Sequence, residues 1–385
     1  MKTVEGWISC QLGNLIIPKN NKAKQVKSTE YTNAGSYPVV DQSADFICGY
    51  HDDATKVIDT DLPLTVFGDH TRHTKFISFP FIAGADGTQI LKPRPEIEDK
   101  FFYYLISYAA DKMGNFGYDR HFKYLKEFVC HFPTSKREQT KIAEVLSTVD
   151  RAIEQTEALI AKQQRIKTGL MQDLLTRGID EHGNLRSEKT HKFKDSPLGR
   201  IPVEWEVYQI GNVARLQRGH DITETELQEG PHPVVSSSGA IGYHFKYTSN
   251  SPNVVVGRKG TIGKVHYIEQ DFWAHDTTLY VTNFFGNNER FVYYLFTYLD
   301  LARYGTKSGS PSLNRNDIYP VLVALPTPKE QMQIARLLLE HDCETDIMVL
   351  NLDKAVHIKI ALMQHLLTGK KRVPNLPYPS EVPVS

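Results

Sequence analysis

An internal repeat constrains the fold of this 385-residue chain more than any other feature of its sequence. Residues 138–176 align without a gap with residues 330–368, at a constant offset of 192, and 15 of the 39 aligned positions are identical. Upstream of these tracts the offset drifts, and Trp7 is matched by Trp205 at an offset of 198. Small insertions in surface loops produce such drift around a retained scaffold. We therefore expect two structurally equivalent copies.

The first part of each copy predicts a domain that mixes strands with one helix. Short β-branched and aromatic runs at residues 64–67, 75–79 and 253–256 are bounded by Gly, Asp and Pro, a pattern that indicates strands joined by turns. An apolar and aromatic helix is predicted at residues 98–110 in the first copy and at residues 289–302 in the second. Each copy therefore begins with an α/β domain.

The second part of each copy predicts one long helix without proline. Its apolar residues recur at alternating spacings of three and four, which is the seam of a coiled coil. The seam of the first helix contains Ile142, Leu146, Val149, Ile153 and Ile160. The seam of the second contains Ile334, Leu338, Met348 and Leu352, with His341 and Thr345 as interruptions. A lone helix of this length cannot bury its stripe, so we expect the two helices to pack on each other as an antiparallel pair.

The predicted fold class is α+β, with two α/β domains separated by two long antiparallel helices that form a coiled coil, related by an internal pseudo-twofold repeat. The predicted segments are domain 1 (1–137), helical region 1 (138–178), an exposed polar linker (179–200), domain 2 (201–327), helical region 2 (328–371) and a tail (372–385). Gly178 and Gly369 are the predicted stop signals of the two helices.

Composition excludes several classes of protein. The 45 Lys and Arg residues balance the 45 Asp and Glu residues, which argues against a globally basic nucleic-acid binder, although local basic patches remain possible. No apolar run approaches the ~18 residues of a membrane span, and the first residues lack the core of a signal peptide. The four cysteines form no CxxC pair. We expect a reduced cytoplasmic protein without a membrane partner.

Two motifs superficially indicate catalysis. Asp69, His70 and His73 form a DHxxH cluster, but a loop pair of histidines without a third ligand is more often polar surface than a metal site. The glycine-rich stretch at residues 257–264 departs from a phosphate-binding loop in its glycine spacing, and Val265 follows its lysine where Ser or Thr is needed. We therefore assign no catalytic, cofactor-binding or metal-binding residue.

The same stretch predicts a basic tip between two strands. Arg258 and Lys259 are suited to a guanine edge or a phosphate, and short hydroxyl side chains suit both as well. The candidate DNA-contacting residues of the second copy are Ser236, Ser237, Ser238, Arg258, Lys259, Ser308 and Ser310. Those of the first copy are Gln42, Ser43, His70 and Arg72.

The tracts at residues 132–143 and 325–335 each contain a proline, a short spacer, Glu-Gln, two further residues and Ile-Ala. This pattern resembles the signature of type I restriction-modification specificity subunits, the S subunit or HsdS family. The helix ends at residues 170–176 and 362–368 also match that family, and so does the opening at residues 201–205. The resemblance covers essentially the whole chain.

This resemblance implies a non-catalytic DNA-recognition subunit in which two target-recognition domains read a bipartite, asymmetric sequence. It also implies that the helices fix the spacing and dock two modification subunits, which carry adenine-N6 methylation. Restriction subunits, which translocate and cleave DNA, complete the assembly. S-adenosylmethionine, ATP and Mg2+ are expected on these partners and no cofactor on this chain. Two alternatives stay open: a protein-binding coiled-coil scaffold and a self-sufficient DNA methyltransferase or nuclease.

Overall fold

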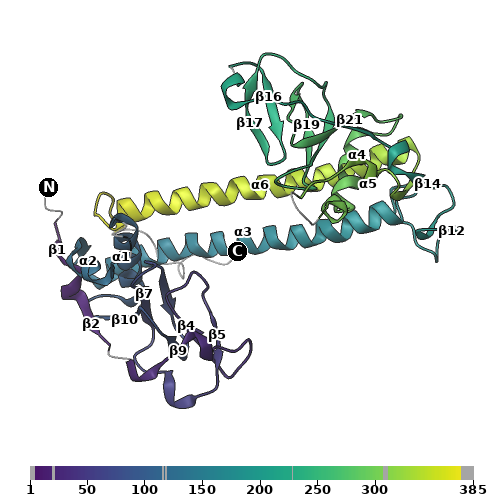
Figure 1. The fold of residues 1–385 in the computed structure, drawn as a ribbon. Coiled ribbons are helices and arrows are strands. Elements are labelled where there is room, and N and C mark those ends of the chain that lie inside the picture. The colour runs from purple at the N-terminus through teal and green to yellow at the C-terminus, as the bar shows by residue number, and fades with distance from the viewer. Residues whose placement is uncertain are drawn as a thin grey trace, which may run out of the picture. The chain divides into compact units, whose positions relative to one another are not determined.

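The computed structural model describes residues 5–19, 22–114, 117, 119–227, 229–306 and 311–373. The chain forms two compact units, which are described separately (Figure 1). Unit 1 contains Met1–Glu157 and Leu350–Ser385, and unit 2 contains Ala158–Val349. Each unit therefore combines one mixed domain with a stretch of both long helices.

Unit 1 contains a two-stranded sheet and two larger sheets beside its helices. Strand β1 (Trp7–Gln11) pairs antiparallel with β11 (Val129–Pro133). The four-stranded sheet has the order β2 (Ile16–Pro18), β10 (Thr88–Pro93), β7 (Leu64–Gly68) and β8 (Thr74–Ile77). The other sheet has the order β3 (Gln25–Val26), β9 (Phe81–Gly84), β4 (Tyr37–Val40) and β5 (Gly49–His51), and β6 (Val57–Ile58) also pairs with β9. The two short helices are α1 (Asp99–Lys112) and α2 (Phe122–Glu127).

Unit 2 repeats this arrangement. Strand β14 (Glu206–Gln209) pairs with β22 (Leu322–Leu325), and the four-stranded sheet has the order β15 (Arg215–Arg218), β21 (Thr278–Asn283), β18 (Asn253–Gly257) and β19 (Val265–Ile268). The smaller sheet has the order β17 (Gly239–His244), β16 (His232–Ser236) and β20 (Trp273–Ala274). Helices α4 (Glu289–Tyr298) and α5 (Arg315–Ile318) correspond to α1 and α2. The matching strand order confirms the repeat.

Most local predictions are confirmed. The runs at residues 64–67 and 253–256 lie in β7 and β18, and the helix predicted at residues 98–110 is α1. The run at residues 75–79 overlaps β8, which ends at Ile77. The helix predicted at residues 289–302 is too long, because α4 ends at Tyr298 and the chain turns at Asp300 with a φ of 47°. A short 3-10 helix then follows.

The two long helices are α3 (Lys136–Thr176) and α6 (Pro328–Leu366). In unit 1, Glu138 near the start of α3 pairs with Arg372, which follows the end of α6. Asp150, further along α3, pairs with Lys359, which lies earlier in α6. In unit 2, Lys167 pairs with Asp342, while Ile179 contacts Glu330. Both sets of contacts show that the helices are antiparallel.

The predicted seam lies on the packed face of each helix. Ile142, Leu146, Ile334 and Leu338 are fully buried, and Ile160 is 9% exposed. The remaining predicted seam residues, Val149, Ile153, Met348 and Leu352, are half-buried. The polar interruption at His341 is accommodated by Gln163, whose Oε1 lies 3.1 Å from His341 Nε2.

The segment predicted as an exposed linker, residues 179–200, is more structured than expected. A hairpin of β12 (Phe193–Ser196) and β13 (Gly199–Pro202) closes it, and Ile179 is buried. The expectation of exposure is wrong for Arg186, which is 8% exposed because it neutralises the buried carboxylate of Glu330. In the described part of the chain, no helix has the length and apolar character to cross a membrane.

Candidate functional site

The Glu-Gln pair at the start of each long helix connects the domain to the helices. Gln139 accepts a hydrogen bond from the backbone N–H of Glu98, the N-cap of α1, at 2.8 Å and donates to the carbonyl of Pro133 at 2.9 Å. Gln331 makes the equivalent bonds with Asn288, the N-cap of α4, and with Pro326. Each glutamine thus joins the domain helix to the strand before the long helix.

The glutamate of each pair binds an arginine that follows the other long helix. Glu138 accepts from Arg372 at 2.7 Å. Glu330 accepts from Arg186 and from the indole N–H of Trp205, which is fully buried. These contacts give the shared signature a structural role.

A second pair of contacts connects the domain helices to α3 and α6. Tyr104 of α1 donates to Asp150 at 2.6 Å, and Asp150 also binds Lys359 at 2.7 Å. Tyr294 of α4 donates to Asp342 at 2.9 Å, and Asp342 also binds Lys167. Burial, with a contribution from the aspartate, raises the pKa of both tyrosines. Both domains are therefore anchored in the same way, and their differences lie in their loops.

In domain 1 the structure brings two of the candidate residues together. The backbone N–H of His70 donates to Oε1 of Gln42 at 3.1 Å, and the hydroxyl of Thr71 donates to the carbonyl of Gln42. The loop after β4 and the tip after β7 are therefore joined at Gln42. The side chain of His70 is exposed, so it remains available to a ligand.

A buried lysine supports the same loop. Lys75 of β8 is 4% exposed and donates to the carbonyls of Asp41, at 2.8 Å, and Asp45. Burial opposes ionisation of Asp41, but hydrogen bonds from the Cys48 thiol and the Ser43 backbone outweigh it and lower the pKa of its carboxyl. Ser43 therefore helps to hold this loop through its bond to Asp41, in addition to being a candidate for DNA contact.

Arg72, the remaining candidate of domain 1, and Asp69 of the DHxxH cluster both have structural partners. Arg72, with a φ of 63°, donates to the carbonyls of Met113, at 3.1 Å, and Ala110 at the end of α1. Asp69 is buried and accepts from the backbone N–H of Phe122 at 2.8 Å. Asp69 therefore binds the first turn of α2, and no group of three His, Cys, Asp or Glu residues suited to a metal occurs among the described residues.

In domain 2, residues 257–264 form the predicted tip between β18 and β19. A strand follows Lys264, whereas a phosphate-binding loop requires a helix there. Ser236 and Ser237 are buried, and their hydroxyls bond to Gly239 and to the backbone N–H of Thr261 within the unit. Ser237 therefore supports the tip and Ser236 the turn before β17, whereas Ser238 is exposed. Lys259 is half-buried, and Ser308 and Ser310 lie outside the described residues.

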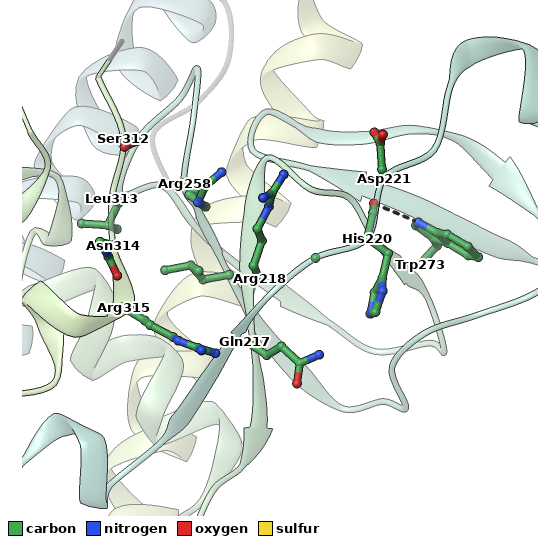
Figure 2. Close-up of a pocket in the computed structure, with 12 residues that line it drawn as sticks. Gln217, Arg218, His220, Asp221, Arg258, Trp273, Ser312, Leu313, Asn314 and Arg315 are labelled. Atoms are coloured by element: carbon green, nitrogen blue, oxygen red, sulfur yellow. Dashed lines mark hydrogen bonds between the residues drawn. The ribbon is translucent and has the colours of Figure 1, made fainter. Parts of the chain in front are cut away.

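A hollow of about 980 Å³ opens beside this tip in unit 2. It collects side chains from β15, from the tip and from the segment before α5, which are distant in sequence (Figure 2). The side chains around it include Gln217, Arg218, His220, Asp221, Arg258, Trp273, Asn314 and Arg315. Arg218 is held by Asp276 at 2.9 Å and Arg315 by the carbonyl of Leu216 at 3.1 Å. This basic concavity is a candidate binding site in domain 2.

Arg258 is the candidate residue that the structure places in the hollow. Among the described residues its buried Nη1 has no hydrogen-bond partner. The arginines at positions 218 and 315 were not predicted from the sequence. The basic residues Arg215 and Arg218 and the polar run at residues 314–317 were the signals that could have indicated them.

Backbone contacts show which residue of domain 1 corresponds to Arg258. Arg258 donates to the carbonyl of Thr277 at 2.7 Å and accepts from the N–H of Leu313 at 2.9 Å. Asp69 makes the same two contacts, with Gly87 and His121, both at 2.8 Å. The two domains therefore place an arginine and an aspartate at one equivalent position.

Comparison with known proteins identifies a family match that covers most of the chain. Residues 5–163 and 202–355 each match the family described as type I restriction modification DNA specificity domain. The chain is 26% identical over 271 residues to the MjaVIII type I restriction enzyme specificity subunit of Methanocaldococcus jannaschii, covering 62% of this chain and 61% of that one. It is 22% identical over 171 residues to the EcoprrI specificity subunit of Escherichia coli, covering 42% of this chain and 43% of that one. These matches span about three fifths or less of the relatives' lengths.

Two solved structures share the fold. The crystal structure of a type I restriction-modification system S subunit from M. genitalium aligns with a TM-score of 0.65 at 17% identity, over 98% of this chain and 99% of that one. A structure described as the basis of complex assembly and conformational transition of the type I R-M system aligns with a TM-score of 0.58 at 14% identity, over 96% of this chain and 100% of that one. At these identities the likeness concerns the fold.

Proposed function

The chain belongs to the type I restriction modification DNA specificity family, and from this premise we propose that it selects the DNA sequence on which a type I restriction-modification complex acts. Domains 1 and 2 each read one half of a bipartite, asymmetric target, and α3 with α6 sets the spacing between the halves. The chain itself is non-catalytic, and the complex works on DNA in the cytoplasm.

The hollow of domain 2 carries this proposal. Three arginines surround it together with amide, imidazole and indole groups, which is a combination suited to phosphates and base edges. The neutral total charge is compatible with DNA binding because the basic groups are concentrated locally. Domain 1 presents a different set of side chains on an equivalent framework, as expected of a domain that reads another sequence.

The long helices support the proposed docking of two modification subunits. Helix α6 carries apolar side chains that are more than half exposed, at 58% for Ile347, 60% for Leu350 and 53% for Ile358. Exposed apolar residues of this size are typical of protein interfaces. The modification subunits would contribute S-adenosylmethionine, and restriction subunits would contribute ATP and Mg2+ chemistry.

Genome-wide mapping of adenine methylation in the source cell tests this function directly. With the chain present, we expect a two-part motif with a fixed spacer, and deletion of the chain should abolish methylation at that motif. Methylation that persists at the same motif after deletion would contradict the proposal. The isolated chain is expected to bind DNA weakly, and nanomolar sequence-specific binding in a gel shift at physiological salt would contradict that expectation.

The two alternative functions make different predictions. A self-sufficient methyltransferase would bind radiolabelled S-adenosylmethionine as the purified chain, whereas a recognition subunit would not. For a protein-binding scaffold, exchange of residues 1–137 for another recognition domain would leave the methylated sequence unchanged. For the proposed function, this exchange should alter one half of the motif and keep the other.

A further inference from the structure

The position of Arg258 is fixed by the domain around it. Its backbone N–H and carbonyl are bonded to Thr277 and Leu313, so the residue is held between β21 and the segment before α5. The side chain extends from the end of β18 into the hollow, where Arg218 borders the same space (Figure 2). The guanidinium thus extends from a backbone position that is hydrogen-bonded on both sides.

The guanidinium of Arg258 differs from those of Arg218 and Arg315 in having a buried donor without a partner among the described residues. Arg218 and Arg315 donate to Asp276 and to the Leu216 carbonyl, whereas the buried Nη1 of Arg258 has no acceptor within the described residues. An unpaired buried donor of this kind is costly, and a ligand that supplies an acceptor relieves the cost. Arg258 as a whole is half-buried and lines the open hollow, so a ligand there contacts its guanidinium, while Nη1 itself is covered by the protein.

Besides its arginines, which suit phosphates and base edges alike, the hollow contains groups that favour a base edge. Gln217 and Asn314 can both donate and accept, and Leu279 and Leu313 are apolar. The carboxylate of Asp221 would repel a phosphate. In the major groove guanine presents two adjacent acceptors, O6 and N7, which match the two donors of a guanidinium.

We propose that Arg258 determines specificity for one guanine in the half-site that domain 2 reads, by donating two hydrogen bonds to its O6 and N7. This inference rests on the proposed function. The equivalent residue of domain 1, Asp69, uses its carboxylate to bind the start of α2 and is 2% exposed. Domain 1 therefore lacks this reader, and the difference contributes to the asymmetry of the target.

The test compares methylation motifs in source cells that carry the wild-type chain, R258A or R258Q. In R258A, one guanine position in one half of the motif should lose about 10- to 100-fold of its preference. The other half of the motif should remain unchanged, which also shows that the complex is assembled. R258Q should lose the guanine preference too, because an amide pairs with adenine rather than guanine. R200A, which removes an exposed arginine of β13, is the matched control and should leave the motif unchanged.

Three outcomes are decisive against the inference. An unaltered motif in R258A would overturn it. A uniform loss of methylation across all sites would identify a phosphate contact instead, if the slope of log binding constant against log salt concentration also falls by about 1. If R258A abolishes methylation altogether, the binding of the R258Q complex is measured on duplexes that differ by single base pairs. A guanine preference that R258Q retains would overturn the inference. A wild-type chain without any two-part motif would contradict the proposed function itself.

Discussion

Arg186 and Glu330 form a buried ion pair in unit 2, with Nη1 2.5 Å from Oε1 and Nη2 3.2 Å from Oε2. The pair joins the segment after α3 to the first turn of α6, although the two residues are 144 positions apart. Because the same carboxylate accepts from Trp205, the contacts at Glu330 join three separate parts of the chain, including α6 itself. The pair is therefore a structural joint between the helices and domain 2.

Removal of the arginine from this joint should destabilise the protein strongly. In R186A the carboxylate of Glu330 stays buried without its cation, and the free energy of unfolding should fall by about 3–5 kcal/mol. Urea unfolding followed by circular dichroism measures the change. R200A, which breaks the exposed pair with Glu188, should cost no more than about 1 kcal/mol. Equal losses in the two variants would show that the buried pair has no special role.

Stability should decrease in alkaline solution because of the anchoring tyrosines. The pKa of Tyr104 and of Tyr294 is raised in the folded chain by burial and by the neighbouring aspartate. A group with a raised folded pKa contributes stability below its unfolded pKa and loses that contribution as the pH rises. For tyrosine the loss begins near pH 10, its ordinary pKa.

Urea unfolding at a series of pH values checks this expectation. The free energy of unfolding should fall above pH 10, and the fall should be shallower in the double variant Y104F/Y294F. The double variant Y208F/Y243F, in which both replaced side chains are exposed, should follow the wild type. If the free energy of unfolding of Y104F/Y294F falls with pH as steeply as that of the wild type, the two tyrosines are not the cause of the alkaline loss of stability.

The loop that carries Gln42 should depend on Lys75. In K75M the carbonyls of Asp41 and Asp45 lose their buried donor, which should cost about 1–3 kcal/mol locally. Hydrogen exchange measured by mass spectrometry should accelerate in peptides covering residues 41–48. K27M, which replaces an exposed lysine of the same domain, should leave these rates unchanged. Unchanged exchange in K75M would mean that other contacts hold the loop.

The exposed apolar residues of α6 should be needed for assembly and not for folding. I347E and L350E place a charge where a partner would bury an apolar side chain, so co-purification with the modification subunit should fall at least about 10-fold. Thermal unfolding should remain close to that of the wild type. Q209E adds the same charge at an exposed polar position of β14, outside α6, and is the control. Full co-purification of I347E and L350E would place the interface elsewhere.

Local and periodic features could be predicted from the sequence. The repeat predicted two copies with the same strand order, and the spacing of Ile142, Leu146, Ile334 and Leu338 predicted the buried seam, because helix and strand periodicity determine which side chains share a face. The tip around Arg258 was also recognisable from its glycines. The boundaries of the individual domains and the DNA contacts of the candidate residues stay predictions.

Only the tertiary structure showed which charged residues lie inside the protein and which line the hollow. Arg186 was expected on an exposed linker and is buried, while Arg72 of the candidate set binds the end of α1. Arg218, Arg258 and Arg315 come from three separate segments that meet only after the sheet has formed. Sequence periodicity describes neighbours within one element, whereas the pairing of distant charges depends on long-range packing, and this is why the fold was predictable and the composition of the site was not.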